Sequence, residues 1–252
     1  MFHETLLGKT ALITGGARGI GKAIALKLAQ HGCNVIIAYY NSADEAEQIC
    51  TEVQAMGRRT LAVQVNVADE HSVAEMMERV KEHFEHIHIV ISNAASGVLK
   101  PALKMSTKHW RWCLETNALA LNHLVVHIKS FIPKGGRILA LSSLGAIRAI
   151  PNYAFIGASK AALEALVRSL SLELAPDGIS VNTISAGIVD TDALKYFPNR
   201  EELLQECRER SLSARLIEPQ DVANVAYLLC LPESEMIKGQ TIFVDAGYSI
   251  LG

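Results

Sequence analysis

The sequence lacks a surplus of charge of either sign. Its 252 residues include 24 Lys or Arg and 26 Asp or Glu, which gives a formal net charge of −2. Surfaces that bind nucleic acid concentrate positive charge, and the basic pairs of this chain are short. We therefore expect no nucleic-acid partner.

Long apolar runs and paired cysteines are also missing. No stretch reaches the ~20 apolar residues of a membrane span, and no basic segment followed by an apolar one opens the chain. We therefore expect a cytoplasmic protein with no membrane partner. The five cysteines are scattered without Cys-x-x-Cys spacing, so they predict buried core residues and neither a disulfide framework nor a metal site.

What the sequence does have is a regular alternation of apolar, β-branched runs with longer amphipathic segments. The runs cover 10–14, 34–39, 60–65, 87–92, 137–142, 179–184 and 240–245. They are nearly continuous in apolar character, as strands covered on both faces are. The pattern predicts an α/β fold, a single-domain Rossmann-type doubly wound parallel sheet of about seven strands with helices on both faces, spanning 1–252.

A glycine-rich segment follows the first of these runs. Residues 14–21 read Thr-Gly-Gly-Ala-Arg-Gly-Ile-Gly and open a helical pattern that ends near His31. Glycines let a backbone turn tightly and approach a pyrophosphate, which then meets the free N–H groups of the helix. This predicts a dinucleotide-binding loop. Its expected contact residues are Gly15, Arg18, Gly19, Ile20 and Gly21.

The end of the second run indicates which dinucleotide binds. Residues 36–42 contain no Asp or Glu, although an NAD site usually places an acid there on the ribose 2′-hydroxyl. Arg18 could instead pair with a 2′-phosphate. The hypothesis is therefore NADPH, and the alternative is that Arg18 is a solvated surface residue.

Over its full length the chain resembles the short-chain dehydrogenase/reductase family. The likeness is carried by the loop at 14–21, Ser92-Asn93-Ala94-Ala95, Asn117, and the segments 182–191 and 239–247. Some positions depart from the family pattern: Ala186 replaces a Pro, Ser92 an Asn and Ala246 a Gly.

The resemblance implies further contacts with the cofactor. Asn66 and Val67 would lie at the adenine, Asn93 near the adenosine ribose, Ile188 at the nicotinamide carboxamide, Thr191 near the pyrophosphate and Lys160 at the nicotinamide ribose. It also implies a homotetramer or homodimer built through the helices at 107–131 and 152–176.

The most informative feature is the spacing between Tyr153 and Lys160. The family keeps its catalytic Tyr four residues before the Lys, where this chain has Ile156, which carries no proton to donate. Seven residues of helix turn about 700°, so Tyr153 and Lys160 are predicted to share one face. Ser143 occupies the position of the family's catalytic serine, seventeen residues before the Lys.

A Tyr-x6-Lys arrangement is that of the enoyl-thioester reductases of this superfamily. Together with 94–99, 144–148 and 190–200, it makes the chain similar to the NADPH-dependent enoyl-[acyl-carrier-protein] reductase III group. The resemblance implies reduction of the 2,3 double bond of trans-2-enoyl thioesters in fatty acid elongation. The substrate would be carried by acyl-carrier protein or coenzyme A.

This chemistry assigns different tasks to the three predicted catalytic residues. Hydride addition at the β-carbon leaves negative charge on the thioester oxygen, to which Tyr153 would donate a hydrogen bond. Lys160 would hold the nicotinamide ribose, and Ser143 would steady the substrate. Two alternatives stay open: a carbonyl or alcohol oxidoreductase acting on 3-oxoacyl thioesters, and a catalytically silent NADP(H)-binding regulatory protein.

Two segments that follow predicted strands, 93–106 and 185–218, are too long for simple turns. In doubly wound sheets such loops lie at the carboxyl edge, where ligands bind. The part from 192 to 215 mixes aromatic, aliphatic and charged residues and is predicted to be a substrate lid. An ordinary surface excursion is the alternative.

Overall fold

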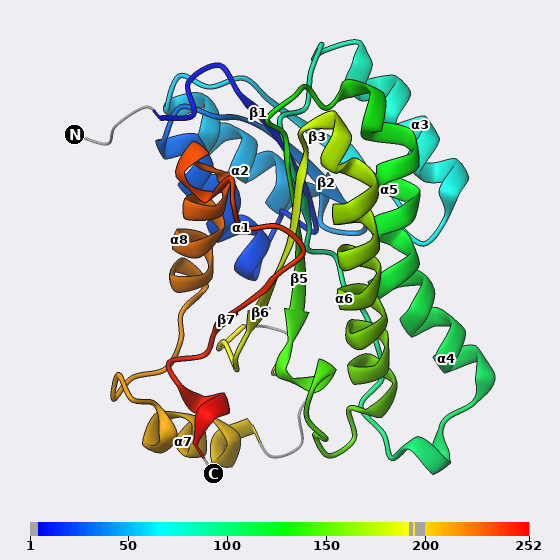
Figure 1. The fold of residues 1–252 in the computed structure, drawn as a ribbon, viewed down its shortest axis with the longest axis vertical. Helices are drawn as coiled ribbons and strands as arrows, with labels where there is room; N and C mark the ends of the chain where they lie inside the picture. The colour runs from blue at the N-terminus through cyan, green and yellow to red at the C-terminus, as the bar shows by residue number, and fades with distance from the viewer. Residues whose placement is uncertain (1–4, 192–193, 195–199, 252) are drawn as a thin grey trace.

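The seven strands form one parallel sheet in the order β3-β2-β1-β4-β5-β6-β7 (Figure 1). The structure is a computed structural model, and it describes residues 5–191, 194 and 200–251. The strands are β1 (Thr10–Thr14), β2 (Asn34–Tyr39), β3 (Thr60–Gln64), β4 (Ile89–Ser92), β5 (Arg137–Ser143), β6 (Ser180–Ala186) and β7 (Thr241–Val244). The predicted doubly wound sheet is confirmed, and the strand bounds differ from prediction by no more than two residues.

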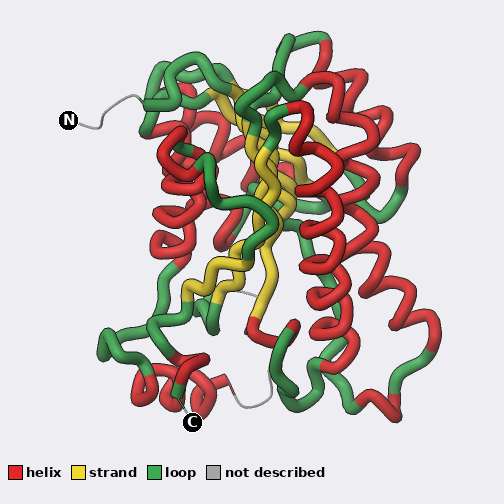
Figure 2. Tube along the Cα trace, in the orientation of Figure 1, coloured by secondary structure: helices red, strands yellow, loops and turns green. Residues whose placement is uncertain are grey.

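Helices cover both faces of the sheet (Figures 1 and 2). One face carries α1 (Gly19–Gln30), α2 (Ala43–Ala55) and α8 (Pro219–Cys230), and the other carries α3 (Glu70–Lys81), α5 (Ala120–Ile128) and α6 (Ala154–Leu174). The buried apolar side chains divide accordingly into two clusters. Along β1, Ala11 and Ile13 belong to one cluster and Leu12 to the other, which is why this strand is apolar throughout.

The helix predicted over 107–131 is interrupted. It consists of α4 (Thr107–Leu114), a π-helical turn (Glu115–Leu119), α5 and a short 3-10 turn (Lys129–Phe131). Asn117 lies in the π turn, a feature that often marks functional sites. Its buried side-chain amide accepts from the Ser96 N–H at 2.8 Å and donates to the Ser96 carbonyl at 2.8 Å and the Ser159 hydroxyl at 2.9 Å. The π turn thus fixes the loop after β4 to α6.

The five cysteines are all buried and unpaired, which confirms that they are core residues. Within residues 5–191, 194 and 200–251, no helix is long and apolar enough to cross a membrane. The same residues contain no group of three His, Cys, Asp or Glu placed to hold a metal ion.

Candidate active site

Glycine determines the shape of the loop between β1 and α1. Gly15 and Gly19 have φ of 62° and 54°, in the left-handed region that favours glycine. A Cβ at Gly21 would lie 2.3 Å from the Gly15 carbonyl oxygen, so only glycine lets α1 pack this closely on the loop. Arg18, the N-cap residue of α1, does not cap it with its side chain. The first N–H groups of α1 are therefore available to an anion.

The end of β4 holds this loop in place. The Asn93 side chain donates hydrogen bonds of 3.0 Å to the carbonyls of Thr14 and Gly15. In return, the Thr14 hydroxyl accepts from the backbone N–H groups of Asn93 and Ala94 at 3.0 and 3.1 Å. Asn93 therefore supports the loop, a role that the sequence did not indicate, and its predicted ribose contact stays a prediction.

The other predicted cofactor residues lie around the same edge of the sheet. Thr191 lies against the loop, since its methyl carbon is 3.5 Å from the position of a Cβ at Gly19. The Asn66 side chain accepts from the Ala68 N–H at 3.2 Å, which shapes the turn after β3. The remaining three are the buried Val67, the half-buried Ile20 and Ile188 in the loop after β6.

These features fit a bound dinucleotide. The loop offers a cradle that a Cβ would fill, an open helix N-terminus lies beside it, and Arg18 is exposed there. The β2 end that follows, Tyr39 to Ser42, carries no acid. Arg18 is thus free to meet a phosphate on the adenosine ribose.

Ser143 and Tyr153 form a direct pair. The Ser143 hydroxyl, at the end of β5, lies 3.3 Å from the Tyr153 phenol oxygen. Tyr153 is the N-cap residue of α6 rather than part of it, with φ −110° and ψ 7°. The helix between Tyr153 and Lys160 therefore begins one residue later than the prediction assumed, at Ala154, and their position on one face stays a prediction.

The residue before Tyr153, Asn152, has a left-handed backbone conformation that sets the direction in which the chain enters α6. Asn152 has φ of 63°, a conformation that asparagine tolerates better than most residues. Its carbonyl accepts from the Lys100 N–H at 3.0 Å, and the Tyr153 N–H donates to the Ile150 carbonyl at 3.1 Å. The loop after β4 thus also supports the chain that leads to Tyr153.

Lys160 is buried on α6, where one hydrogen bond and one nearby charge act on its ammonium. Its ammonium donates to the Leu141 carbonyl at 2.7 Å. Glu164, one turn further along α6, is also buried, and its carboxylate accepts from the Ser142 hydroxyl at 2.6 Å. Sequence reasoning missed Glu164, although its position four residues after Lys160 puts it on the same side of the helix.

Burial shifts the pKa values of both predicted catalytic side chains. It raises the pKa of Tyr153, while the hydrogen bond from Ser143 acts in the opposite direction. The phenol therefore stays protonated at neutral pH and can donate. Burial lowers the pKa of Lys160 to about 8, and the charge of Glu164 opposes this shift. Lys160 thus holds its proton at neutral pH and loses it under mildly alkaline conditions.

Residues 15–249 match the family model described as "Enoyl-(Acyl carrier protein) reductase". The chain belongs to this family of short-chain dehydrogenases/reductases. It is 33% identical to a hydroxynaphthalene reductase-like protein of Metarhizium anisopliae, over 97% of this chain and 96% of the relative. It is 35% identical to the 1-cyclohexenylcarbonyl-CoA reductase of Streptomyces collinus, over 96% and 88%.

A solved structure supports the same assignment. A short-chain dehydrogenase of Burkholderia cenocepacia, in complex with NADP, is 32% identical to this chain, with a TM-score of 0.90 and coverage of 97% of this chain and 99% of that one. The protein is therefore an oxidoreductase of this family.

The predicted lid includes α7 (Arg200–Arg210), which lies beyond the carboxyl ends of the strands. The Tyr248 hydroxyl donates to Glu206 at 3.0 Å, and the Arg210 guanidinium lies 4.7 Å from the Tyr248 ring centre, so the C-terminal segment holds α7. Residues 192–193 and 195–199 of the predicted lid, with the aromatic pair at 196 and 197, lie outside the described residues. The function of α7 as a lid stays a prediction.

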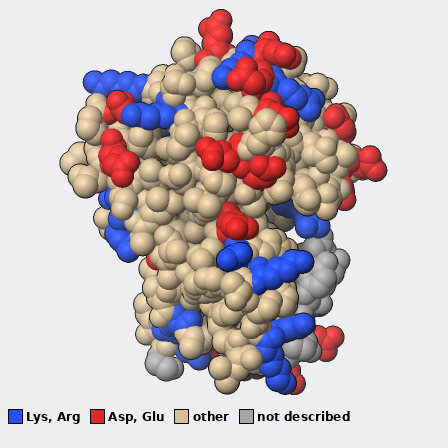
Figure 3. Space-filling view, turned by 90° about the vertical axis from the view of Figure 1, so that its right-hand side faces the viewer, with Lys and Arg blue, Asp and Glu red and all other residues tan. Residues whose placement is uncertain are grey.

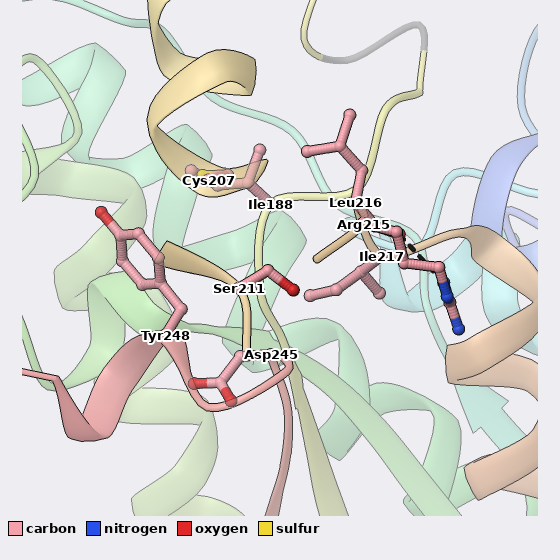
Figure 4. A pocket seen from close by; sticks show the side chains of 8 residues that line it. All are labelled: Ile188, Cys207, Ser211, Arg215, Leu216, Ile217, Asp245 and Tyr248. Carbon is pink, nitrogen blue, oxygen red and sulfur yellow. Dashed lines mark hydrogen bonds between the residues drawn. The ribbon is translucent and has the colours of Figure 1, made fainter. Parts of the chain in front are cut away.

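A small pocket lies between α7, the loop after β6 and the segment after β7 (Figure 4). Its lining residues are Ile188, Cys207, Ser211, Arg215, Leu216, Ile217, Asp245 and Tyr248. Ile188, the predicted nicotinamide contact, thus faces the elements that carry the predicted lid.

A group of cations follows β4 and was not recognised in the sequence. Lys100, Lys104, Lys108 and Arg111 are all exposed, and residues 100–111 contain no acid. No ion pair joins any of these four to a carboxylate in the described part of the chain, whereas some other surface cations, such as Lys22 with Glu52, are paired. On the face shown in Figure 3, most acidic side chains lie in the upper half, away from the α4 end.

This cationic segment, 100–111, adjoins the candidate site. Trp110 packs edge-on against Phe155 of α6, with ring centres 5.0 Å apart. Trp110 thus packs α4 against α6, and the cations lie beside the start of α6.

Proposed function

We propose that the protein reduces the 2,3 double bond of trans-2-enoyl thioesters with NADPH. One observation carries the proposal: the phenol that pairs with Ser143 comes from Tyr153, while the family's tyrosine position holds Ile156. A phenol is thus available as donor, but it belongs to Tyr153, three residues before the position of the family's tyrosine.

The chemistry of an enoyl thioester suits this arrangement. NADPH, when bound, would supply the hydride that adds to the β-carbon, charge would develop on the thioester oxygen, and a proton from solvent would then add to the α-carbon to complete the reduction. The protonated Tyr153 phenol donates a hydrogen bond to that oxygen, and Ser143 orients the phenol. Lys160 donates to the nicotinamide ribose and keeps a positive charge near the site.

The cofactor assignment has two supports. Arg18 is exposed at the N-terminus of α1, and the β2 end has no acid to select the 2′-hydroxyl of NAD. The related dehydrogenase of Burkholderia cenocepacia was solved with NADP. We therefore assign NADPH to this loop.

The substrate assignment draws on one relative. By its name, the Streptomyces collinus reductase acts on a coenzyme A thioester whose double bond is conjugated to the carbonyl. The cationic segment 100–111 suits the negative charge of either coenzyme A or acyl-carrier protein. We propose that the substrate arrives on one of these carriers in fatty acid elongation, in the cytoplasm, and that the protein acts as a homotetramer or homodimer.

A carbonyl reductase of the same fold is the second candidate. In that reaction, hydride would add to the carbonyl carbon and the Ser143–Tyr153 pair would protonate the carbonyl oxygen. The hydroxynaphthalene reductase-like relative of Metarhizium anisopliae favours this candidate by name.

Consumption of NADPH with two thioesters separates the candidates. The proposal predicts rapid oxidation with crotonyl-CoA or crotonyl-acyl-carrier protein and little with the matching acetoacetyl thioesters. The opposite preference would establish the carbonyl reductase. Tight NADPH binding without turnover of either thioester would leave the catalytically silent protein.

A further inference from the structure

The 3-10 turn after β5, η4 (Leu144–Ala146), packs on the first turn of α6 through two glycines. A Cβ at Gly157 would lie 2.5 Å from the Gly145 carbonyl oxygen, so Gly157 lets the two backbones approach. Gly145 contributes something different. A Cβ at Gly145 would lie 2.6 Å from both Cδ1 and Cε1 of the Tyr153 ring, a separation that such atoms do not reach.

The backbone of Gly145 does not itself require glycine. Its φ is not positive, so its backbone lies outside the left-handed region. Alanine could adopt that conformation, so the obstacle to a side chain at position 145 is the Tyr153 ring. Gly145 is therefore needed for the space it leaves to the Tyr153 ring and not for its backbone conformation.

A second glycine receives the residue that replaces the family's tyrosine. A Cβ at Gly97 would lie 2.3 Å from Cγ1 and 2.6 Å from Cδ1 of Ile156. Two side chains at the start of α6 therefore pack against glycines: Ile156 against Gly97 and Tyr153 against Gly145. In its position against Gly145, the Tyr153 phenol oxygen lies 3.3 Å from the Ser143 hydroxyl.

We propose that Gly145 is a positioning residue for the reaction: it provides the slot in which the Tyr153 ring lies, and so sets where the phenol meets the thioester oxygen. The inference rests on the proposed function, because it assumes that Tyr153 is the donor. A methyl group at position 145 displaces the ring and carries the phenol away from Ser143.

The crystal structure of Gly145→Ala tests the slot without reference to activity. We expect the Tyr153 ring to be displaced and its oxygen to lie beyond hydrogen-bond distance of the Ser143 hydroxyl. An unmoved ring would overturn the inference. If the ring moves while crotonyl-thioester reduction keeps its wild-type rate, the slot stands and the donor role of Tyr153 in the proposed function fails.

A double-mutant cycle tests whether Gly145 acts through Tyr153. Displacement by about 1 Å can cost about 100-fold, so Gly145→Ala should lower kcat on this scale with the KM for NADPH unchanged. In the Tyr153→Phe background, Gly145→Ala should slow the reaction no further. Equal slowing in both backgrounds would show that Gly145 acts on the backbone and would overturn the proposal.

Thermal denaturation provides a second test of the slot, which applies even if Gly145→Ala folds poorly. The loss of Tm caused by Gly145→Ala should shrink by at least about half in a Tyr153→Ala background, where the ring is absent. Gly157→Ala is the matched control, because its conflict is with the Gly145 backbone and Tyr153→Ala should not relieve it. An undiminished loss in the Gly145→Ala, Tyr153→Ala double variant would contradict the slot.

Discussion

Two turns at the carboxyl edge of the sheet use glycine in different ways. In the loop after β1, Gly15 and Gly19 adopt left-handed backbone and Gly21 permits contact between backbones. In the turn after β5, Gly145 has an unremarkable φ and makes room for the Tyr153 ring. The first arrangement exposes N–H groups to any dinucleotide. The second makes room for one side chain, the Tyr153 ring.

The largest effect is expected at the first turn. Gly21→Ala should weaken NADPH binding by about 100-fold or more, because the new Cβ would lie 2.3 Å from a backbone oxygen that cannot move alone. Titration of NADPH fluorescence, with thermal denaturation to check folding, measures the effect. Gly57→Ala is the control for destabilisation alone, since a Cβ there meets open space but strains a left-handed backbone with φ of 75°. NADPH affinity within about threefold of wild type would remove the loop from the cofactor site.

A variant of Arg18 tests whether the first turn selects NADPH over NADH. Arg18→Ala should raise the Kd for NADPH about 10- to 100-fold and leave that for NADH unchanged, because a charge-assisted pair contributes about 1.5–3 kcal/mol. Lys22→Ala on the same helix, which loses only the pair with Glu52, serves as the control. Equal turnover with both cofactors, unchanged in Arg18→Ala, would contradict the assignment.

The pH dependence of the reaction reports on Lys160, which lies on α6 beyond the second turn. Because burial lowers its pKa to about 8, kcat/KM for NADPH should be highest below pH 8 and fall as the pH rises through it. Glu164 raises that pKa, so Glu164→Gln should move the falling limb to lower pH; each unit corresponds to about 1.4 kcal/mol. Glu173→Gln, an exposed acid of the same helix, should leave the limb in place. An unmoved limb in Glu164→Gln would contradict this coupling.

The smallest effect is expected at the cationic segment beside the second turn. Reversing Lys104 and Lys108 to Glu should raise the KM for crotonyl-CoA or crotonyl-acyl-carrier protein about three- to tenfold at low salt, and the effect should fade at high salt. Lys238→Glu is the control, because Lys238 contacts Ser180 at the opposite edge of the sheet. A loss that does not depend on salt would argue against an electrostatic role.

The first turn could be predicted from the sequence, because each of its features is local. Left-handed glycines, a free helix N-terminus and apolar strands buried on both faces follow from residues close together in the chain. The seven strands could be placed for the same reason.

The second turn could be predicted only in its residue types. That Tyr153 precedes α6 and meets Ser143 depends on the left-handed Asn152 and on packing against Gly145, which no periodicity encodes. The π turn that aims Asn117 at Ser96 also depends on tertiary contacts. The cationic segment, in contrast, was visible in the sequence as four cations without an acid.

The most direct test of the account is the rate of crotonyl-thioester reduction by Tyr153→Phe with saturating NADPH. Removing one hydrogen-bond donor to a developing oxyanion lowers kcat by about 10²–10³. We predict a loss of this size with the KM for NADPH unchanged, since in the proposed mechanism the phenol acts on the substrate and Lys160 on the cofactor. A kcat near that of the wild type would contradict the central claim that Tyr153 is the displaced donor.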